Sequence, residues 1–146
     1  MNLHNQKGIT LVEVLLSIVI LTIVLTSVMN FFPQMGQLNR QNIGKTNAVN
    51  VAKEELRRWQ KSEDVKLLLA GKADGNTIPE YTSEDTNYYY FVKELESLSM
   101  EVKIKKVSDL DTEPTKAHYI HIRLNNEKNA LVSETYGYII YDTGDY

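Results

Sequence analysis

Residues 7–32 read KGITLVEVLLSIVILTIVLTSVMNFF, and this stretch decides the architecture of the chain. From Ile9 to Phe32 it holds 24 residues, of which only Glu13 is charged. A helix of that length measures about 36 Å, which exceeds the roughly 30 Å hydrocarbon core of a bilayer. Because lipid offers no hydrogen-bond partners, a segment inside it must satisfy its own backbone groups. The stretch therefore predicts a transmembrane helix over residues 9–32.

Three interpretations compete for this apolar segment. A cleaved secretory signal has an apolar region of about 7–15 residues followed by an A-x-A site, whereas this run is longer and ends in NFFPQMG. A plain signal anchor, with Glu13 near the membrane interface, is the second. The third gives Glu13 a function, because a carboxylate at mid-membrane costs about 2.5–3.5 kcal/mol and needs a partner.

The third interpretation is favoured by the order of residues around the start of the run. A short polar leader ends in Lys7 and Gly8, and Ile9 is followed by Thr-Leu-Val and then Glu13. This order resembles the N-terminus of type IV pilins and pseudopilins over about residues 7–32. A weaker similarity to the minor subunits, carried by AVNVAKEELRRW, continues to about Trp59.

The resemblance assigns roles to three residues. Gly8 matches the residue before the prepilin peptidase cleavage site, and Ile9, where Phe is usual, matches the first mature residue, whose amine is methylated. Glu13 matches the acidic fifth residue of the mature chain. Cleavage would expose an ammonium at Ile9, and pairing it with the Glu13 carboxylate would offset the burial cost of both charges. The pair can form within one chain, one helical turn apart, or between neighbouring subunits, where it would set their axial register.

Downstream of the membrane segment, the helix either stops at Pro33 or continues with a kink. Apolar residues recur at helical spacing from Met35 to Trp59, which favours continuation to about Lys61. The sequence thus predicts a leader at 1–8, a transmembrane helix at 9–32, an extracytoplasmic helix continuation at 33–61 and a small β-rich globular domain at 62–146. The residues expected to cover the sheet are Val49, Ala52, Leu56 and Trp59.

The C-terminal part is predicted to form three or four antiparallel strands after a short helix or turn at 62–71. Alternating apolar and polar residues predict strands at 100–107 and 118–124, beside strands at 88–95 and 130–141. Gly137 is an alternative break point in the last of these strands. The segment 72–87, KADGNTIPEYTSEDTN, is turn-rich and is expected to be a surface connection. The predicted fold class is therefore α+β, with a long N-terminal helix packed on a small antiparallel sheet.

Candidate chemistry in the globular part is sparse, and we predict no catalytic residues, no metal site and no cofactor. His118 and His121 lie three apart in a strand and so face opposite sides, which predicts surface or edge histidines. Asp109, Asp111 and Glu113 form an oxygen-rich loop that suits calcium but lacks EF-hand spacing. Other singled-out residues are Ser62 and Ser133, which have no matching His and acid, the tyrosines at 88–90, 136, 138 and 141, and the basic strip at Lys103, Lys105 and Lys106.

The favoured function is a non-enzymatic minor pilin or pseudopilin; the alternatives are a single-pass anchored sensor or receptor and an anchored hydrolase. The resemblance implies other pilin-like subunits, a prepilin peptidase, a membrane assembly platform and the lipid bilayer as partners, with the C-terminal domain outside the cytoplasm. Nucleic-acid binding by this chain alone is not expected. Affinity for nucleic acid comes mainly from phosphate neutralisation, and the net charge is −3.

Cleavage between Gly8 and Ile9 is directly testable. Because a small residue before the bond lets a membrane peptidase approach the backbone, intact-mass analysis of protein from cells with an active peptidase should show loss of residues 1–8 and a methyl group on Ile9. Recovery of only the full-length chain from such cells would contradict the pilin interpretation.

Overall fold

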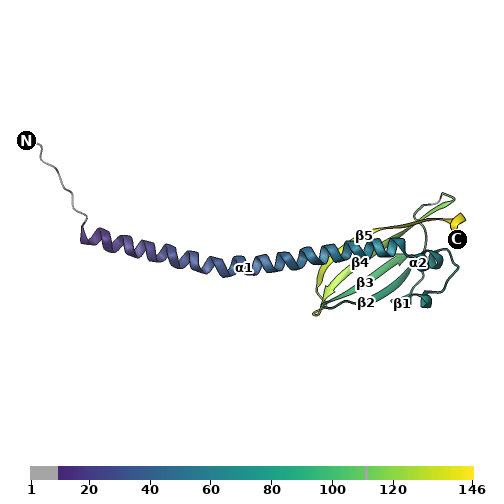
Figure 1. Ribbon diagram of the computed structural model, residues 1–146, viewed down its shortest axis with the longest axis horizontal. Helices are drawn as coiled ribbons and strands as arrows, with labels where there is room; N and C mark the ends of the chain where they lie inside the picture. Colours follow the sequence, from purple (N-terminus) through teal and green to yellow (C-terminus); the bar gives the residue numbers. More distant parts are fainter. Residues whose placement is uncertain (1–9, 111) are drawn as a thin grey trace, which may run out of the picture. The chain divides into compact units, whose positions relative to one another are not determined.

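The computed structural model describes residues 10–110 and 112–146. Helix α1 spans Leu11–Lys61, and a short helix α2 spans Glu63–Leu69, capped by the Ser62 side chain. The chain divides into two compact units, residues 1–43 and residues 44–146. Helix α1 passes from the first unit into the second, and the five-stranded sheet belongs to the second (Figure 1).

Helix α1 continues through Pro33, so the expected continuation is confirmed and the alternative, a stop at this residue, is wrong. The most apolar 18-residue window of α1 has a mean hydropathy of 2.6, which makes the helix long and apolar enough to cross a membrane. The large apolar side chains between Leu11 and Met35 are exposed. A single apolar N-terminal helix of this kind is consistent with a single-pass membrane anchor.

The sheet is an antiparallel meander in which each strand pairs with the next along the chain, in the order β1-β2-β3-β4-β5. This confirms the predicted α+β class, with the long helix packed against an antiparallel sheet. The strands are β1 Tyr81–Glu84, β2 Tyr88–Glu94, β3 Leu98–Lys105, β4 Thr115–Asn126 and β5 Leu131–Asp142. The apolar sets of β3 and β4 fall on one face, as their alternation predicted.

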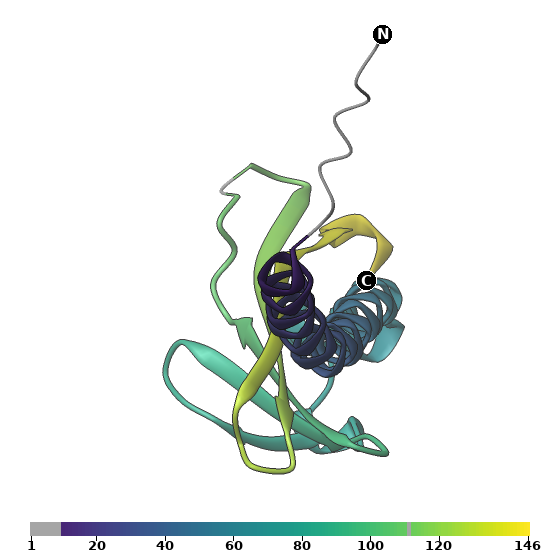
Figure 2. The same cartoon turned by 90° about the vertical axis from the view of Figure 1, so that its left-hand side faces the viewer.

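The core lies between that face and the C-terminal part of α1 (Figures 1 and 2). Ala52 and Trp59 are buried and Leu56 is partly buried, as expected. Val49, however, is 39% exposed, and Ala48 is buried in its place. A shift of one residue on a helix rotates the buried stripe by about 100°, so Ala48 joins Ala52 on the inner face and Val49 turns away.

The segment predicted as a surface connection contains a strand, which corrects the prediction for residues 72–87. Strand β1 has one half-buried residue followed by three exposed ones, so it lacks the apolar alternation that marks a strand. It is held instead by pairing with β2 and by the Tyr81 ring, which meets Phe91 edge-on at 5.8 Å between ring centroids. Gly75 permits this packing, because any Cβ there would collide with the Tyr81 ring.

The last strand is continuous, so the alternative break at Gly137 is wrong. Gly137 pairs with Ile120 and lies directly beneath α1. A Cβ at this position would come within 3.1 Å of Gln60 Nε2 and 3.3 Å of a Leu56 methyl group. Glycine therefore allows the helix to approach the sheet closely, and the Gln60 side chain uses the approach to donate a hydrogen bond to the Tyr138 carbonyl at 3.1 Å.

The corrected helix face predicts unequal effects of two substitutions in α1. Trp59→Ala should lower the free energy of unfolding of the sheet-containing unit by about 3–5 kcal/mol, because it empties a buried aromatic site against Phe91. Val49→Ala should change it by no more than about 0.5 kcal/mol. Near-ultraviolet circular dichroism of the nine tyrosines, all at or beyond Tyr81, reports unfolding of this unit. Equal effects of the two changes would refute the face assignment.

Candidate functional site

The candidate site at the N-terminus of α1 is built on a helix cap. Thr10 precedes the helix, and the Glu13 backbone N–H donates to the Thr10 carbonyl at 3.0 Å and to its Oγ1 at 3.3 Å. A Thr followed three residues later by Glu is the capping-box pattern for a helix start. The local sequence thus fixes the beginning of α1 and places Glu13 in its first turn.

Glu13 lies where a carboxylate is electrostatically favoured, near the positive end of the helix dipole. It is exposed, and no ion pair to it forms among residues 10–110 and 112–146. The Glu13 carboxylate can therefore form an ion pair with a cationic group that lies outside the described residues or on another chain. Gly8 and Ile9, the predicted cleavage and methylation residues, lie outside the described residues, so their pairing with Glu13 stays a prediction.

Hydroxyl groups within the apolar run satisfy themselves on the same helix. Ser17 Oγ donates to the Glu13 carbonyl at 2.7 Å, and Thr22 Oγ1 donates to the Ile18 carbonyl at 2.7 Å. Ser27 does the same with Ile23 at 2.8 Å. In hydrocarbon each hydroxyl needs such a partner. These polar residues are therefore compatible with a lipid-facing helix.

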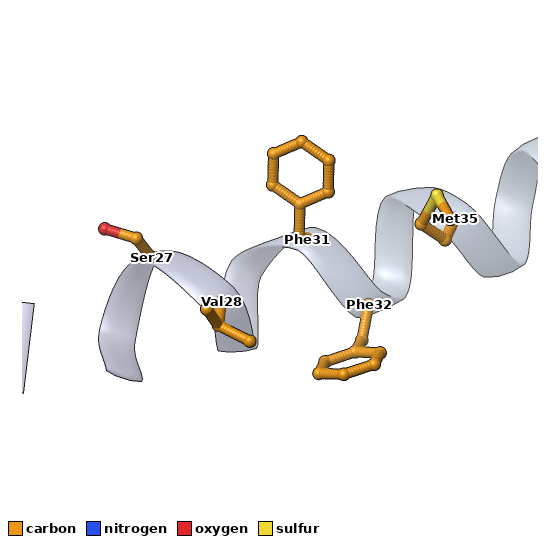
Figure 3. Close-up of a pocket in the computed structure, with 5 residues that line it drawn as sticks. All are labelled: Ser27, Val28, Phe31, Phe32 and Met35. Atoms are coloured by element: carbon orange, nitrogen blue, oxygen red, sulfur yellow. The ribbon is translucent and has the colours of Figure 1, made fainter. Parts of the chain in front are cut away.

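One shallow apolar hollow lies along this helix. Figure 3 shows Phe31 and Phe32 projecting from it in different directions, with Val28 and Met35 on the neighbouring turns. Phe31 is 66% exposed and Phe32 is 71% exposed. Because the hollow is formed by successive side chains of one apolar helix, we assign it to the lipid-facing surface rather than to a ligand site.

The two histidines face opposite sides of the sheet as predicted, but His118 is not a surface or edge residue. It is 3% exposed, and its ring stacks on Tyr141. Its Nδ1 lies 3.0 Å from the Lys105 carbonyl, to which an Nδ1–H donates. The residues Ile120 and Ile122 continue the same buried face, so the alternation in β4 held the signal that His118 is buried. His121 lies on the other face, with Nε2 3.2 Å from Glu134.

The acidic loop before β4 is engaged with lysines. Asp109 pairs with Lys105, and Glu113 pairs with Lys116 at 2.8 Å and accepts from the Thr143 hydroxyl at 3.0 Å. Asp111, the central member of the predicted calcium candidate, lies outside the described residues. Within the described ranges, no three His, Asp or Glu side chains come together as a metal site.

Each lysine of the basic strip already has a partner. Lys103 Nζ lies 3.8 Å from the centre of the Tyr88 ring, Lys105 pairs with Asp109, and Lys106 lies 2.9 Å from Glu84. These contacts occupy the charges that a phosphate backbone would need. The strip thus favours the expected solvated strand face over a nucleic-acid site.

Two of the tyrosines singled out in the sequence, at 136 and 138, belong to an open aromatic surface. Tyr136 is 70% exposed and Tyr138 is 44% exposed, on the sheet face opposite α1. Tyr119 lies between them and contacts both rings at about 6 Å. Aromatic residues in strands usually pack within a sheet, and these rings pack on one another while still facing solvent.

One comparison with known proteins agrees with the resemblance of the N-terminal segment to type IV pilins. Residues 3–29 match the family model of the prokaryotic N-terminal methylation motif. Neither the curated proteins nor the solved structures contain a significant match to the chain. The match covers Gly8, Ile9 and Glu13, and ends within α1.

The buried histidine predicts a pH dependence of stability. Burial lowers the pKa of His118 below its usual range, with the hydrogen bond to Lys105 opposing this shift. The unfolded chain therefore takes up a proton near pH 6.5, before the folded chain does. The contribution of neutral His118 to stability is therefore fully present above that pH. It should decrease as the pH falls from about 6.5 toward the lowered pKa of His118 in the folded chain.

His118→Phe keeps an aromatic ring beside Tyr141 but removes the titrating group. Although loss of the bond to Lys105 should lower its stability at pH 7.5, that stability should decrease less between pH 7 and pH 5 than that of the unaltered chain. Denaturant unfolding at several pH values measures both. Parallel pH profiles for the two proteins would show that His118 is not responsible.

Proposed function

We propose that this chain, a type IV pilin-like protein with an N-terminal methylation motif, is a minor pilin or pseudopilin. It would be a non-enzymatic structural subunit of an envelope filament of the kind used in DNA uptake or type II secretion. The motif supports general association with other pilin subunits and with a prepilin peptidase. The observation that carries the proposal is Glu13, an acid one turn inside an apolar helix of membrane-spanning length.

The arrangement of Glu13 supports a role in assembly. A cleaved Ile9 amine would lie one turn before Glu13, close enough for an ion pair within one chain. In a filament, the amine of a neighbouring subunit can take the same place. A charge pair in a poorly screened environment is costly to break, because either charge alone would be left without compensation. Such a pair would fix how far one subunit is displaced along its neighbour.

In the proposed arrangement, the chain crosses the membrane once and its C-terminal domain lies outside the cytoplasm. A subunit that carries Glu13 can pair with the amine of another subunit, so we place it within or beneath a tip complex. The side chains on the surface of the globular domain would then determine its contacts with neighbouring subunits. Nucleic-acid binding by this chain alone is still not expected, because its lysine strip is engaged with acids and aromatic rings.

Glu13→Gln tests the proposal while preserving side-chain shape. Membrane insertion should be unchanged or improved, because a charge is removed from lipid. Co-purification with other pilin-like subunits should fall by at least about tenfold, since the neighbouring amine loses its partner. Fractionation measures insertion, and mass spectrometry of the purified complex measures association.

Glu54→Gln is the matched control, because Glu54 is an exposed acid on α1 in the sheet-containing unit. It should leave both insertion and association unchanged. If the Glu13 variant associates as well as the unaltered chain, the acid has no part in assembly. If the unaltered chain associates with no pilin-like subunit, the proposed function itself is wrong.

A further inference from the structure

The two edges of the sheet differ in how they are protected. Strand β1 has four residues and an irregular register with β2 between Tyr81 and Ser83. Strand β5, at the other edge, has twelve residues, and its register with β4 is unbroken from Ser133 to Asp142. Short, irregular edge strands resist pairing with other chains, whereas long regular ones act as templates for it. The β5 edge is therefore the one suited to accept another strand.

Two hydrogen bonds show which backbone groups of β5 face outward. The Thr143 N–H donates to the Pro114 carbonyl at 2.8 Å, so the backbone N–H and C=O groups of odd-numbered residues near this end point toward β4. The Tyr138 carbonyl accepts instead from the Gln60 side chain, so the backbone groups of even-numbered residues point away from β4. Because the direction alternates along a strand, the backbone groups of Tyr136 and Ile140 also point to the outer edge.

The outer edge also lacks two of the residue types that normally discourage pairing. Residues 131–142 contain neither proline nor lysine. In the middle of β5 the exposed side chains are aromatic or apolar: Tyr136 is 70% exposed and Ile140 is 56% exposed. An incoming strand would gain main-chain hydrogen bonds from the edge and side-chain contacts with these residues.

Charge narrows the identity of the incoming strand. Glu134 and Asp142 are the only charged residues of β5, and both side chains lie on the same face as Tyr136 and Tyr138. Opposite charges across a strand pair stabilise it, and like charges destabilise it. A second copy of β5 would bring two more acids and no base, and symmetric pairing centred on Tyr138 would set Glu134 against Asp142. A strand with an apolar centre and a Lys or Arg toward its ends is the better complement.

We propose that the β5 edge receives an extended strand of a different pilin-like subunit, with apolar residues opposite Tyr136–Ile140 and basic residues near its ends. The inference rests on the proposed function and names the surface through which the globular domain meets its neighbour. The Gln60 side chain donates to the outward Tyr138 carbonyl, and a backbone N–H of the incoming strand would replace this donor.

The test uses the full-length chain isolated in detergent from the cells that make it, and measures the pilin-like subunits that co-purify. Tyr136→Pro removes an outward N–H without removing a bond to β4, and Ile140→Lys places a charge on the edge. Both should reduce co-purified subunits by at least about tenfold. Val92→Lys is the matched control, because Val92 is 40% exposed on the same face but lies in the interior strand β2. It should retain at least about half of the association.

Amide hydrogen exchange adds a readout that general misfolding would not imitate. In the complex, the amides of Tyr136, Tyr138 and Ile140 should become protected, while those of Thr135 and Gly137 are protected with or without the partner. If the unaltered chain co-purifies subunits and both edge variants match Val92→Lys, the edge inference is wrong and the proposed function stands. Loss of association in Glu13→Gln but not in the edge variants would likewise overturn the edge inference alone. A co-purified second copy of this chain, in place of other subunits, would overturn the identity of the partner.

Discussion

The close approach of α1 to the sheet is the contact on which the globular unit depends. Small residues make it possible: Ala48 and Ala52 are buried on the helix, and Gly137 lies beneath Leu56 on the sheet. Trp59 then fills the end of the contact and meets Phe91 with ring centroids 4.8 Å apart. The chain has no cysteine, so packing rather than disulfide bonds holds this unit together.

The two parts of helix α1 have side-chain patterns that suit different surroundings. Between Leu11 and Met35 it exposes large apolar side chains all around, which is the pattern of a segment surrounded by lipid. Between Ala48 and Trp59 it buries one stripe and exposes charged residues elsewhere. Glu55 lies between Arg58 at 2.7 Å and Lys93 of β2 at 3.5 Å. Surface ion pairs contribute little stability, so we assign these contacts a role in orienting the helix on the sheet.

The sequence predicted those parts of the fold that have a strong periodic signal. The alternation of β3 and β4 and the long apolar helix were both evident from residue order. Strand β1 was missed because its side chains are mostly polar, and its pairing partner lies beyond the local window. Val49 was placed on the buried stripe of α1 because it continues the helical spacing of Ala52, Leu56 and Trp59, although Ala48 is the residue that is buried there.

For the candidate site residues, the sequence was informative about Glu13 and misleading about His118. A local order of residues identified Glu13, and the helix cap at Thr10 explains why it lies in the first turn. His118 was misassigned because a histidine was judged by its type rather than by its buried neighbours Ile120 and Ile122. The exposed β5 edge could not be predicted from sequence, since the same alternation fits an interior strand. Only the order of strands in the sheet shows which strand is last.

The meander order of the sheet has a consequence for how the domain reaches its folded state. Every strand pairs with its sequence neighbour, so each ladder closes through a short connection and most sheet contacts are local. Low contact order is associated with rapid folding. The contact between α1 and β5 is different, because Leu56 and Gly137 are far apart in the chain. We therefore expect the hairpins to form before α1 packs on the sheet, with no step that waits for disulfide formation.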